Sequence, residues 1–409
     1  MLIRAGEGSA RRFMTTLSQW GPRRNPGARA RAPSLAQSRP IRVLMVTARF
    51  LPDVGGTETH TYEVARRMAL RTDLELTLLT TDRSGSRPAC ENLDGFTVMR
   101  CRSYPRRRDY YFSPGVYRQI ISGNYDVVHC QGIHTAVPVL AMAAARRKRT
   151  PYVVTLHTGG HSSALRRRLR TIQWRALGPL LRGAAVIVAV SRFEEQVFRK
   201  ACSLDPARIR IIQNGGDLPV SQSPAEVIPG RIVSCGRLEH YKGHQRVVDA
   251  LPLVQQSVPG ATLHILGSGP YEPQLRARVA ALSLQGSVII ESIDPGDRAR
   301  MAESLGQACV VAVLSEYESN PVAVLEALTL GVPAVGLDTA GIGDLIRDGL
   351  VTGIPQDASP AAIARILAAV LQGRRPAVTA GLPTWDAVAA RLAHVYLDTL
   401  GATPGRSGP

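Results

Sequence analysis

The segment "ACVVAVLSEYESNPVAVLEAL" (308–328) holds a strand-to-helix unit, and this unit decides the fold. Its first part, "ACVVAVLS" (308–315), is an unbroken apolar run, which is typical of a parallel strand buried on both faces. Its last part carries apolar residues that are spaced for a mostly buried helix: Val322, Val324, Leu325 and Leu328. Repeated units of this kind build an α/β fold around a parallel sheet.

The loop between this strand and this helix is unusual because two glutamates lie beside a helix start. Asn320 is a good N-cap residue, and Pro321 suits the first helical position. Glu318 then lies in the loop, and Glu326 lies on the helix about two turns in. The N–H groups of a helix start bind anions. The presence of two carboxylates at this place therefore calls for a chemical explanation.

The rest of the chain alternates short β-branched runs with helix-length segments. The first series of strand candidates is 41–47, 74–80, 126–130, 152–156, 185–190 and 209–212. The second series, after the Pro/Ser-rich segment 216–230, is 231–235, 261–266, 287–290, 309–314 and 333–337. Strands spaced in this way predict two Rossmann-like domains with parallel sheets, and ligands should bind in a cleft at the carboxyl ends of the strands.

The domain boundaries follow from these two series. We expect a first domain over 41–215, a second over 216–384, and a terminal helix over 385–400. This helix carries one apolar stripe, formed by Trp385, Val388, Leu392 and Tyr396, and we expect it to pack back on the first domain. We interpret the Arg-rich, acid-poor segment 1–40 as a disordered basic tail.

The net charge of +18 comes almost entirely from arginine, because only three of the 50 basic residues are lysines (Lys148, Lys200 and Lys242). The six cysteines include no C-x-x-C pair, which favours a reducing cytosol. No apolar run is long enough to span a membrane. We therefore expect a cytoplasmic protein, either free or peripheral on the inner face of the plasma membrane.

Glycine and histidine mark two of the loops that follow strands. In "PDVGGTETH" (52–60), the pair Gly55–Gly56 lets the backbone approach a ligand just before a helix. In "LHTGGH" (156–161), His157 should face the cleft from a strand end, whereas His161 is a weaker candidate. No carboxylate or cysteine lies near these histidines at a metal-ligand spacing, so a zinc site is not expected.

The loop "SCGRLEHYKGH" (234–244) supplies two cations, Arg237 and Lys242. Two cations on one strand-to-helix loop suit a diphosphate, whose charge is neutralised from two sides. Carboxylates are poor phosphate ligands but good acceptors of hydrogen bonds from hydroxyl groups. A ligand that joins hydroxyl-rich parts through a diphosphate is a nucleotide sugar. Glu318 would then hold sugar hydroxyls, and Glu326 would hold ribose hydroxyls.

These motifs resemble those of the retaining GT-B glycosyltransferases of family 4. The resemblance covers about 41–400 and rests on "GGTETH", "LHTGG", "VAVS" (188–191), "QNGGD" (213–217), "GRLEHYKG" and the E-x7-E of Glu318 and Glu326, in this order. It implies a GT-B fold in which the first domain binds a hydroxyl acceptor and the second a UDP- or GDP-sugar. The acceptors of such enzymes include lipid carriers, polysaccharides and small metabolites.

The resemblance also implies a role for each site residue. Arg237 and Lys242 would stabilise the departing diphosphate, Glu318 would orient the donor sugar, and His157 would lie near the reacting sugar. The remaining donor-binding positions are Gly55, Gly56, Gly236, Asn320, Pro321, Val322 and Glu326. Ser319-Asn320-Pro321 replaces the Gly-Phe-Gly of many members, which puts the identity of the donor in doubt.

The resemblance implies a reaction that needs no bound metal and no other cofactor, because cations and helix N–H groups stabilise the charge on the leaving phosphate.

Two other functions stay open at this point. One is a nucleotide-sugar 2-epimerase of the same fold. The other is a non-catalytic basic protein that binds a membrane, since "LRRRLRTIQWR" (165–175) predicts a basic amphipathic helix. Its cations are Arg166, Arg167, Arg168 and Arg170, and a solvated arginine-rich face is the alternative. Nucleic-acid binding is not expected, because aromatics make up only 5% and no recognition motif is present.

Overall fold

The computed structural model describes residues 39–53, 55–105, 111–157, 164–219, 225–294, 296–373 and 381–401, although the side chains of 164–171 are not described. Residues 1–38 of the predicted basic tail lie outside these ranges. The remaining chain forms two sheets, each built mainly from parallel strands.

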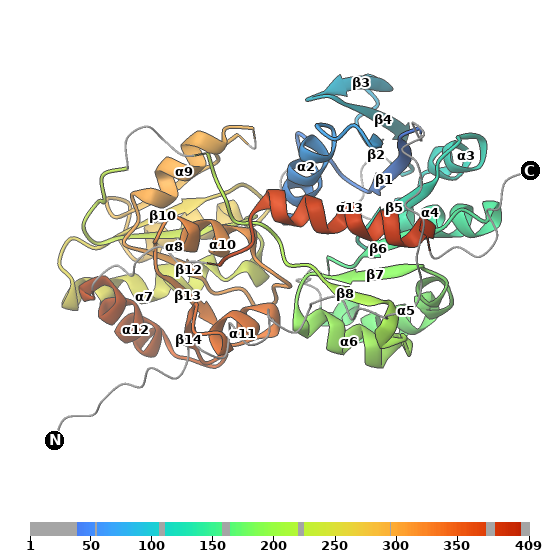
Figure 1. Cartoon of the computed structure of the whole chain (residues 1–409). Helices are drawn as coiled ribbons and strands as arrows, with labels where there is room; N and C mark the ends of the chain where they lie inside the picture. Colours follow the sequence, from blue (N-terminus) through green and yellow to red (C-terminus); the bar gives the residue numbers. More distant parts are fainter. Residues whose placement is uncertain are drawn as a thin grey trace, which may run out of the picture. The chain divides into compact units, whose positions relative to one another are not determined.

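The first sheet has the strand order β3-β4-β2-β1-β5-β6-β7-β8 (Figure 1). Its strands are β1 (Ile41–Thr47), β2 (Leu74–Asp82), β3 (Cys90–Leu93), β4 (Phe96–Arg102), β5 (Val127–Gln131), β6 (Tyr152–Thr155), β7 (Val186–Ala189) and β8 (Ile209–Ile211). Neighbouring strands pair in parallel, apart from the antiparallel pair β3–β4. The sheet therefore has the parallel core that the alternating sequence pattern predicts.

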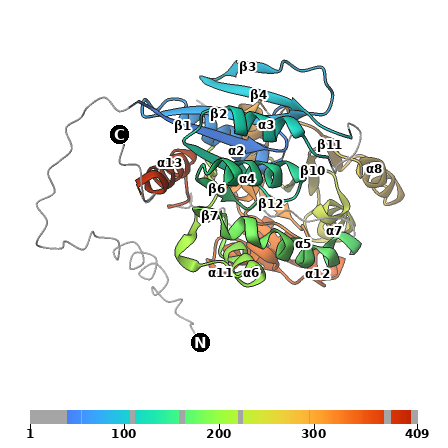
Figure 2. The same cartoon turned by 90° about the vertical axis from the view of Figure 1, so that its right-hand side faces the viewer.

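Helices cover both faces of this sheet, because successive residues of each strand point to opposite faces. Leu44 and Val46 of β1 pack with α3 (Pro114–Ser122), α4 (Ala136–Lys148), α5 (Ala164–Arg182) and α6 (Arg192–Cys202). Val43 and Met45 pack on the other face with α2 (Gly56–Met68) and α13 (Trp385–Gly401). Figure 2 shows α4 and α13 on opposite sides of β6. A short 3₁₀ helix, η1 (Pro206–Arg208), precedes β8.

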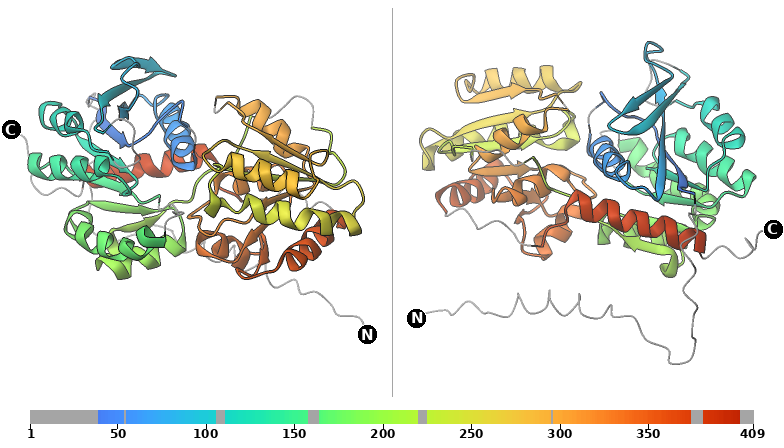
Figure 3. Two further views of the ribbon diagram at one scale, coloured as in Figure 1. Left: turned by 180° about the vertical axis from the view of Figure 1, so that it is seen from behind. Right: turned by 45° about the horizontal axis from the view of Figure 1, so that its top comes forward.

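The second sheet is entirely parallel and has the order β11-β10-β9-β12-β13-β14. Its strands are β9 (Arg231–Cys235), β10 (Thr262–Leu266), β11 (Val288–Glu291), β12 (Val310–Val313), β13 (Ala334–Leu337) and β14 (Thr352–Ile354). One face carries α7 (His244–Ser257), α8 (Glu272–Ala281) and α12 (Pro360–Gln372), and α7 and α12 lie side by side (Figure 3). The other face carries α9 (Arg298–Gly306), α10 (Val322–Thr329) and α11 (Ala340–Arg347).

The predicted α/β fold is confirmed, and each predicted strand is present within about two residues of its expected bounds. The sequence analysis missed three strands, β3, β4 and β14. The hairpin β3–β4 turns at Asp94–Gly95, and both of these residues have positive φ angles (46° and 88°). Asp-Gly is a strong hairpin signal, but β3 is a partly exposed edge strand without an apolar run. β14 is a three-residue edge strand, too short to give a pattern.

The apolar stripe of the terminal helix is confirmed. Trp385, Val388, Leu392 and Tyr396 are all at most 1% exposed. They share one hydrophobic cluster with β1 and α2, so α13 covers part of the first sheet. In the sequence, however, α13 comes directly after the elements of the second sheet. Tyr396 also shares a 2.6 Å hydrogen bond with His129 Nδ1 on β5.

Within the described residues, no helix combines the length and the apolar character that crossing a membrane requires.

We expect Trp385→Ala to lower the free energy of unfolding by about 3–5 kcal/mol, because it removes a fully buried aromatic side chain that anchors α13. Leu397→Ala on the same helix is the matched control, since Leu397 is 40% exposed and its removal should cost no more than about 0.5 kcal/mol. Denaturant-induced unfolding measures both changes. Equal effects of the two substitutions would contradict the packing of α13 on the sheet.

Candidate active site

Two glycines shape the loop that carries the predicted phosphate-binding cations. Gly236, directly after β9, has a φ of +145°, and Gly243 has a φ of +77° after the short 3₁₀ helix η2 (His240–Lys242). A Cβ on Gly243 would overlap the backbone oxygen of Leu314, at the end of β12. Glycine at 243 therefore lets the loop after β9 approach the loop after β12.

This approach brings Lys242 and Glu318 together, 76 positions apart in the chain. Lys242 Nζ donates to Glu318 Oε1 at 2.6 Å, and Ser315 Oγ donates to the same oxygen at 2.8 Å. The two charged side chains are 16% and 15% exposed, so both remain accessible from solvent. Burial lowers the pKa of Lys242, but the neighbouring Glu318 carboxylate raises it, and the net pKa is raised. The ammonium is therefore charged at neutral pH.

Arg237 lies on the same loop and is the more exposed cation. Its guanidinium contacts Glu239 at 2.9 Å and the Tyr241 hydroxyl at 3.1 Å, and its side chain is 39% exposed. Beneath it, the buried His244 accepts from Ser234 Oγ through Nδ1 and donates from Nε2 to the Arg237 carbonyl oxygen. Burial lowers the pKa of His244 to about 4, so the ring supports the loop without adding charge. The loop "SCGRLEHYKGH" (234–244) ends with His244, but the sequence analysis gave this residue no role.

The predicted N-cap role of Asn320 is wrong. Pro321 occupies the N-cap position of α10, and the helix begins at Val322. The Asn320 side-chain oxygen instead accepts from the backbone N–H of Asn214 at 2.8 Å, and Asn214 Nδ2 donates to the Asn320 carbonyl oxygen at 2.8 Å. Asn320 therefore ties the loop after β12 to the segment that joins the two sheets. A partner 106 positions away cannot be read from local spacing.

The start of α2 lies beside the start of α10. Gly55 is the N-cap residue of α2 and Gly56 its first residue, and a Cβ on Gly56 would lie 3.8 Å from the Val322 side chain. The N–H groups of the first helical turn have no partner within their own helix, and the helix dipole favours anions there. The two helix starts thus lie side by side, but the carboxylate of Glu58, in the first turn of α2, lies beside Gly55, so the start of α2 already has an anionic partner.

His157 lies at the end of β6 and is buried (7% exposed). Its Nε2 donates to Gln131 Oε1 at 2.8 Å, and its φ of 44° is unusual for a residue with a side chain. Its ring packs edge-on against His60, with 4.5 Å between the ring centroids, and His60 donates to Asn214 Oδ1 at 2.9 Å. Burial lowers the pKa of His157 well below its ordinary value.

A chain of side-chain contacts therefore runs from His157 through His60 and Asn214 to Asn320. It links β6, α2 and the loop after β12. The motifs "GGTETH" and "QNGGD" contain His60 and Asn214, but the sequence analysis gave neither residue a role. The weaker candidate His161 lies outside the described residues.

Among the predicted site residues, Glu326 is the one whose surroundings differ most from its predicted role as a ribose ligand. Its carboxylate is only 2% exposed and is paired with Arg298, which also lies 3.8 Å from Glu63 on α2. Burial raises the pKa of Glu326, and the Arg298 guanidinium opposes this effect. Contact between this carboxylate and a ribose would require neighbouring side chains to move. Arg298 follows a loop after β11, and no sequence signal connects it with Glu326.

Two other predictions are only partly covered by the described residues. α5 contains the predicted basic helix, but the side chains of Arg166, Arg167, Arg168 and Arg170 are not described, so binding to an anionic membrane surface stays a prediction. Among the described residues, no group of three His, Cys, Asp or Glu side chains is placed to hold a metal ion.

Comparison with known proteins gives matches over nearly the whole chain. The family model "Glycosyltransferase Family 4" matches residues 54–219, and "Glycosyl transferases group 1" matches 222–379. A GDP-mannose:cellobiosyl-diphosphopolyprenol alpha-mannosyltransferase of Komagataeibacter xylinus is 26% identical over 88% of this chain and 94% of that protein. A D-inositol 3-phosphate glycosyltransferase of Jonesia denitrificans is 27% identical over 87% and 94%.

Solved structures share the fold. A sucrose-phosphate synthase from Thermosynechococcus elongatus superposes with a TM-score of 0.68 at 15% identity, over 89% of this chain and 100% of that one. Anabaena HepE in complex with UDP and glucose superposes with a TM-score of 0.63 at 17% identity, over 88% and 96%. The two family models and the curated relatives favour a transferase over the epimerase and over the non-catalytic membrane-binding protein. The chain belongs to the group 1 glycosyltransferases of family 4 and is a glycosyltransferase with the GT-B fold.

Proposed function

We propose that this enzyme is a retaining glycosyltransferase that moves a sugar from a UDP- or GDP-sugar to a hydroxyl acceptor. The observation that carries the proposal is the pairing of Lys242 Nζ with Glu318 Oε1 at 2.6 Å, beside Arg237 and the start of α10. The second domain would hold the nucleotide sugar and the first would hold the acceptor. Because several similar proteins are named for GDP-mannose, this is the first donor to test.

The charged groups divide between the two parts of such a donor. Arg237 and Lys242 face the diphosphate, and the first turn of α10 adds backbone N–H groups. Glu318, held in place by Ser315 and Lys242, accepts hydrogen bonds from sugar hydroxyls. The ribose contact assigned to Glu326 stays a prediction, because Arg298 holds its carboxylate in this structure.

The reaction breaks the bond between the anomeric carbon and the diphosphate oxygen, and the electron pair leaves with the diphosphate. Lys242, Arg237 and the helix N–H groups stabilise this negative charge where it develops. The acceptor oxygen attacks on the same face, and its proton passes to the departing phosphate oxygen. The neutral ring of His157 places no positive charge beside the sugar, which becomes cationic in the transition state.

Lys242→Ala should reduce the rate of sugar transfer by about 10²–10³-fold, because it removes a preorganised cation from the leaving group. The control is Lys200→Ala, since Lys200 is an exposed residue on α6 away from this site. Initial rates with radiolabelled GDP-mannose or UDP-glucose and a lipid and metabolite extract measure the change. A Lys242→Ala enzyme that folds and keeps its parental rate would rule out this role.

Removal of divalent metals should leave the rate unchanged, because protein cations provide the charge neutralisation in this proposal. The measurement compares initial rates after treatment with EDTA and after addition of Mg²⁺ or Mn²⁺. Loss of transfer in EDTA, with recovery on addition of either metal, would contradict a metal-independent mechanism.

Acid should destabilise the site because its buried histidines resist protonation. Burial lowers the pKa of His60 to about 4, below the ordinary 6.5, so the unfolded chain takes up this proton first. The stabilisation is complete above about pH 6.5 and is lost toward about pH 4, at no more than about 1.4 kcal/mol per pH unit.

His60→Gln should therefore reduce the slope of unfolding free energy against pH between about pH 6.5 and pH 4. His394→Gln is the control, because His394 is exposed on α13. Denaturant titrations at several pH values give both slopes. An unchanged slope in His60→Gln would mean that His60 does not titrate as its burial indicates.

A further inference from the structure

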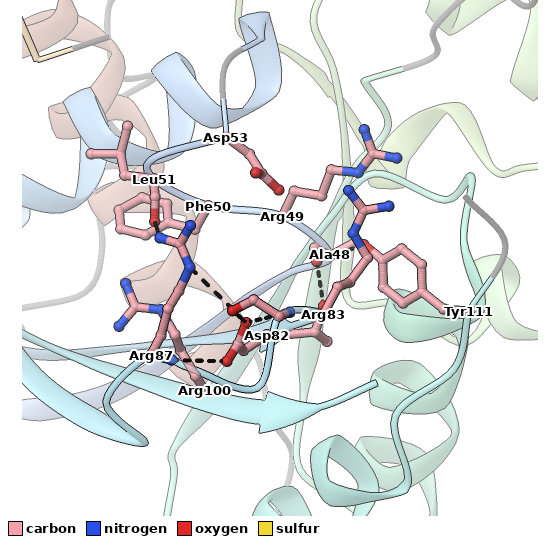
Figure 4. A pocket seen from close by; sticks show the side chains of 12 residues that line it. Ala48, Arg49, Phe50, Leu51, Asp53, Asp82, Arg83, Arg87, Arg100 and Tyr111 are labelled. Carbon is pink, nitrogen blue, oxygen red and sulfur yellow. Dashed lines mark hydrogen bonds and ion pairs between the residues drawn. The ribbon is translucent and has the colours of Figure 1, made fainter. Parts of the chain in front are cut away.

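The carboxyl ends of the central strands of the first sheet hold two different groups of side chains. A cavity at the ends of β1 and β2 is lined by charged residues that are paired within the chain (Figure 4). Arg87 and Asp82 approach each other to 4.0 Å there, and Arg100 approaches Glu91 to 2.6 Å. The strands β5 and β6, on the other side of β1, end instead at uncharged side chains, Gln131 and His157. A ligand can form hydrogen bonds there without separating an ion pair.

Gln131 and His157 are brought together by the pairing of parallel strands. Gln131 is the last residue of β5 and lies in register with Thr155 of β6, and His157 follows Thr155 by two positions. His157 Nε2 donates to Gln131 Oε1 at 2.8 Å, although 26 positions separate the two residues. Gln131 is 2% exposed and His157 7%, so water competes little for this hydrogen bond.

The Gln131 side chain is itself only half satisfied. Its amide nitrogen Nε2 is buried and has no hydrogen-bond partner within the described residues. A buried amide group without a partner costs free energy. An apolar side chain of similar size would fill the same space without this cost, so the bond to His157 is the interaction that favours a glutamine at this position.

The backbone of His157 is held as well. Its φ of 44° lies in the left-handed region, which is strained for a residue with a side chain. His134, three positions after the end of β5, donates from Nε2 to the His157 carbonyl oxygen. Residues in and just after β5 therefore fix both the ring and the backbone of His157. A strained residue that is held in this way is typical of functional sites.

The hydrogen bond to Gln131 also determines which nitrogen of the His157 ring carries the proton. A neutral imidazole has one N–H donor and one lone-pair acceptor, so donation from Nε2 leaves Nδ1 as the acceptor. Burial lowers the pKa of His157 well below its ordinary value, and the neighbouring His60, His129 and His134 lower it further, so the ring is neutral. No described residue forms a hydrogen bond with His157 Nδ1, which leaves its lone pair to a ligand.

We propose that Gln131 is a positioning residue for sugar transfer: it keeps the proton of the His157 ring on Nε2, so that Nδ1 accepts a hydrogen bond from a hydroxyl group of the donor sugar. The inference rests on the proposed function, in which this sugar becomes cationic in the transition state. A hydroxyl that donates to a lone pair gains electron density on its oxygen, which stabilises a neighbouring positive charge. The other tautomer would direct an N–H group at the sugar and withdraw electron density from it.

Gln131→Met removes the acceptor of this hydrogen bond and keeps a similar side-chain volume. It should lower kcat about tenfold and leave the KM for the donor unchanged, because the lost effect belongs to the transition state. Initial rates with radiolabelled GDP-mannose or UDP-glucose measure both constants. The matched control is Gln255→Met, since Gln255 on α7 of the second domain donates to the Ala261 carbonyl oxygen at 2.9 Å. A parental kcat in a folded Gln131→Met chain would overturn the inference.

Gln131→Glu distinguishes control of the tautomer from packing. At low pH the added carboxyl group and the ring share one extra proton. Nδ1 then carries a proton in either arrangement, because a protonated carboxyl group donates to Nε2 and an imidazolium is protonated on both nitrogens. As the pH rises and the extra proton leaves, the carboxylate accepts from Nε2 and Nδ1 becomes an acceptor again.

The kcat of Gln131→Glu relative to the parent should therefore rise with pH toward the parental value, whereas that of Gln131→Met should stay low at every pH. The titratable groups that face the ring, His60, His129 and His134, are the same in all three chains, so their effects cancel in this ratio. Equal pH profiles of the two variants would mean that residue 131 acts through packing alone, which contradicts the inference.

Nitrogen-15 NMR of the full chain, labelled at the histidine rings, observes the tautomer directly. The parent should show the His157 proton on Nε2, and His157→Gln assigns these signals by their loss. A proton on Nδ1 in the parent would overturn the inference whatever the rates of the variants.

Titration of GDP and UDP separates this inference from the proposed function. Gln131→Met should bind nucleotide as the parent does, because it leaves the pair of Lys242 and Glu318 unchanged. If the parent binds neither nucleotide, the proposed function fails, and the inference that rests on it fails as well. If the parent binds nucleotide and transfers sugar but Gln131→Met keeps the parental kcat, only the inference fails.

Discussion

The ion pair between Lys242 and Glu318 joins the loop after β9 to the loop after β12, and the site is arranged around it. Its geometry depends on Gly243, where any side chain would overlap the backbone oxygen of Leu314. With this approach, a cation and a carboxylate face the same partly exposed space, 2.6 Å apart. A ligand that suits both must carry negative charge in one part and hydroxyl groups in another, as a nucleotide sugar does.

The first domain reaches the same place partly through neutral groups. Its contribution is a chain of buried hydrogen bonds and ring contacts from His157 through His60 to Asn214 and Asn320. Because burial lowers the pKa values of both histidines, the chain carries no charge near neutral pH. The positive charge at the site therefore comes from fixed sources, namely Lys242, Arg237 and the helix start at Val322. Such a field needs no rearrangement when charge develops on a leaving group.

Sequence patterns predicted the parts of this structure that depend on residues close together in the chain. Apolar runs and helix periodicity located the parallel strands, and a single stripe identified the buried face of α13. The meeting of Lys242 with Glu318 could also be inferred, because both follow strands of one parallel sheet and loops of this kind share one edge. The partners of Asn320 and Glu326 could not be inferred. Asn214 lies 106 positions from Asn320, and Arg298 lies 28 positions from Glu326. Whether the Asn320 side chain caps its own helix or bonds a distant residue is decided by tertiary packing, which local spacing does not reveal.

Calorimetric titration of GDP and UDP into the parent and Lys242→Ala chains tests the central claim most directly, because it measures whether the paired cation and carboxylate hold a nucleoside diphosphate. We predict that the parent binds one of the two nucleotides at one site per chain, and that Lys242→Ala weakens this binding by at least about tenfold, as expected for loss of a charge-assisted contact. Absence of binding by the parent, or equal affinity in the two chains, would contradict the claim.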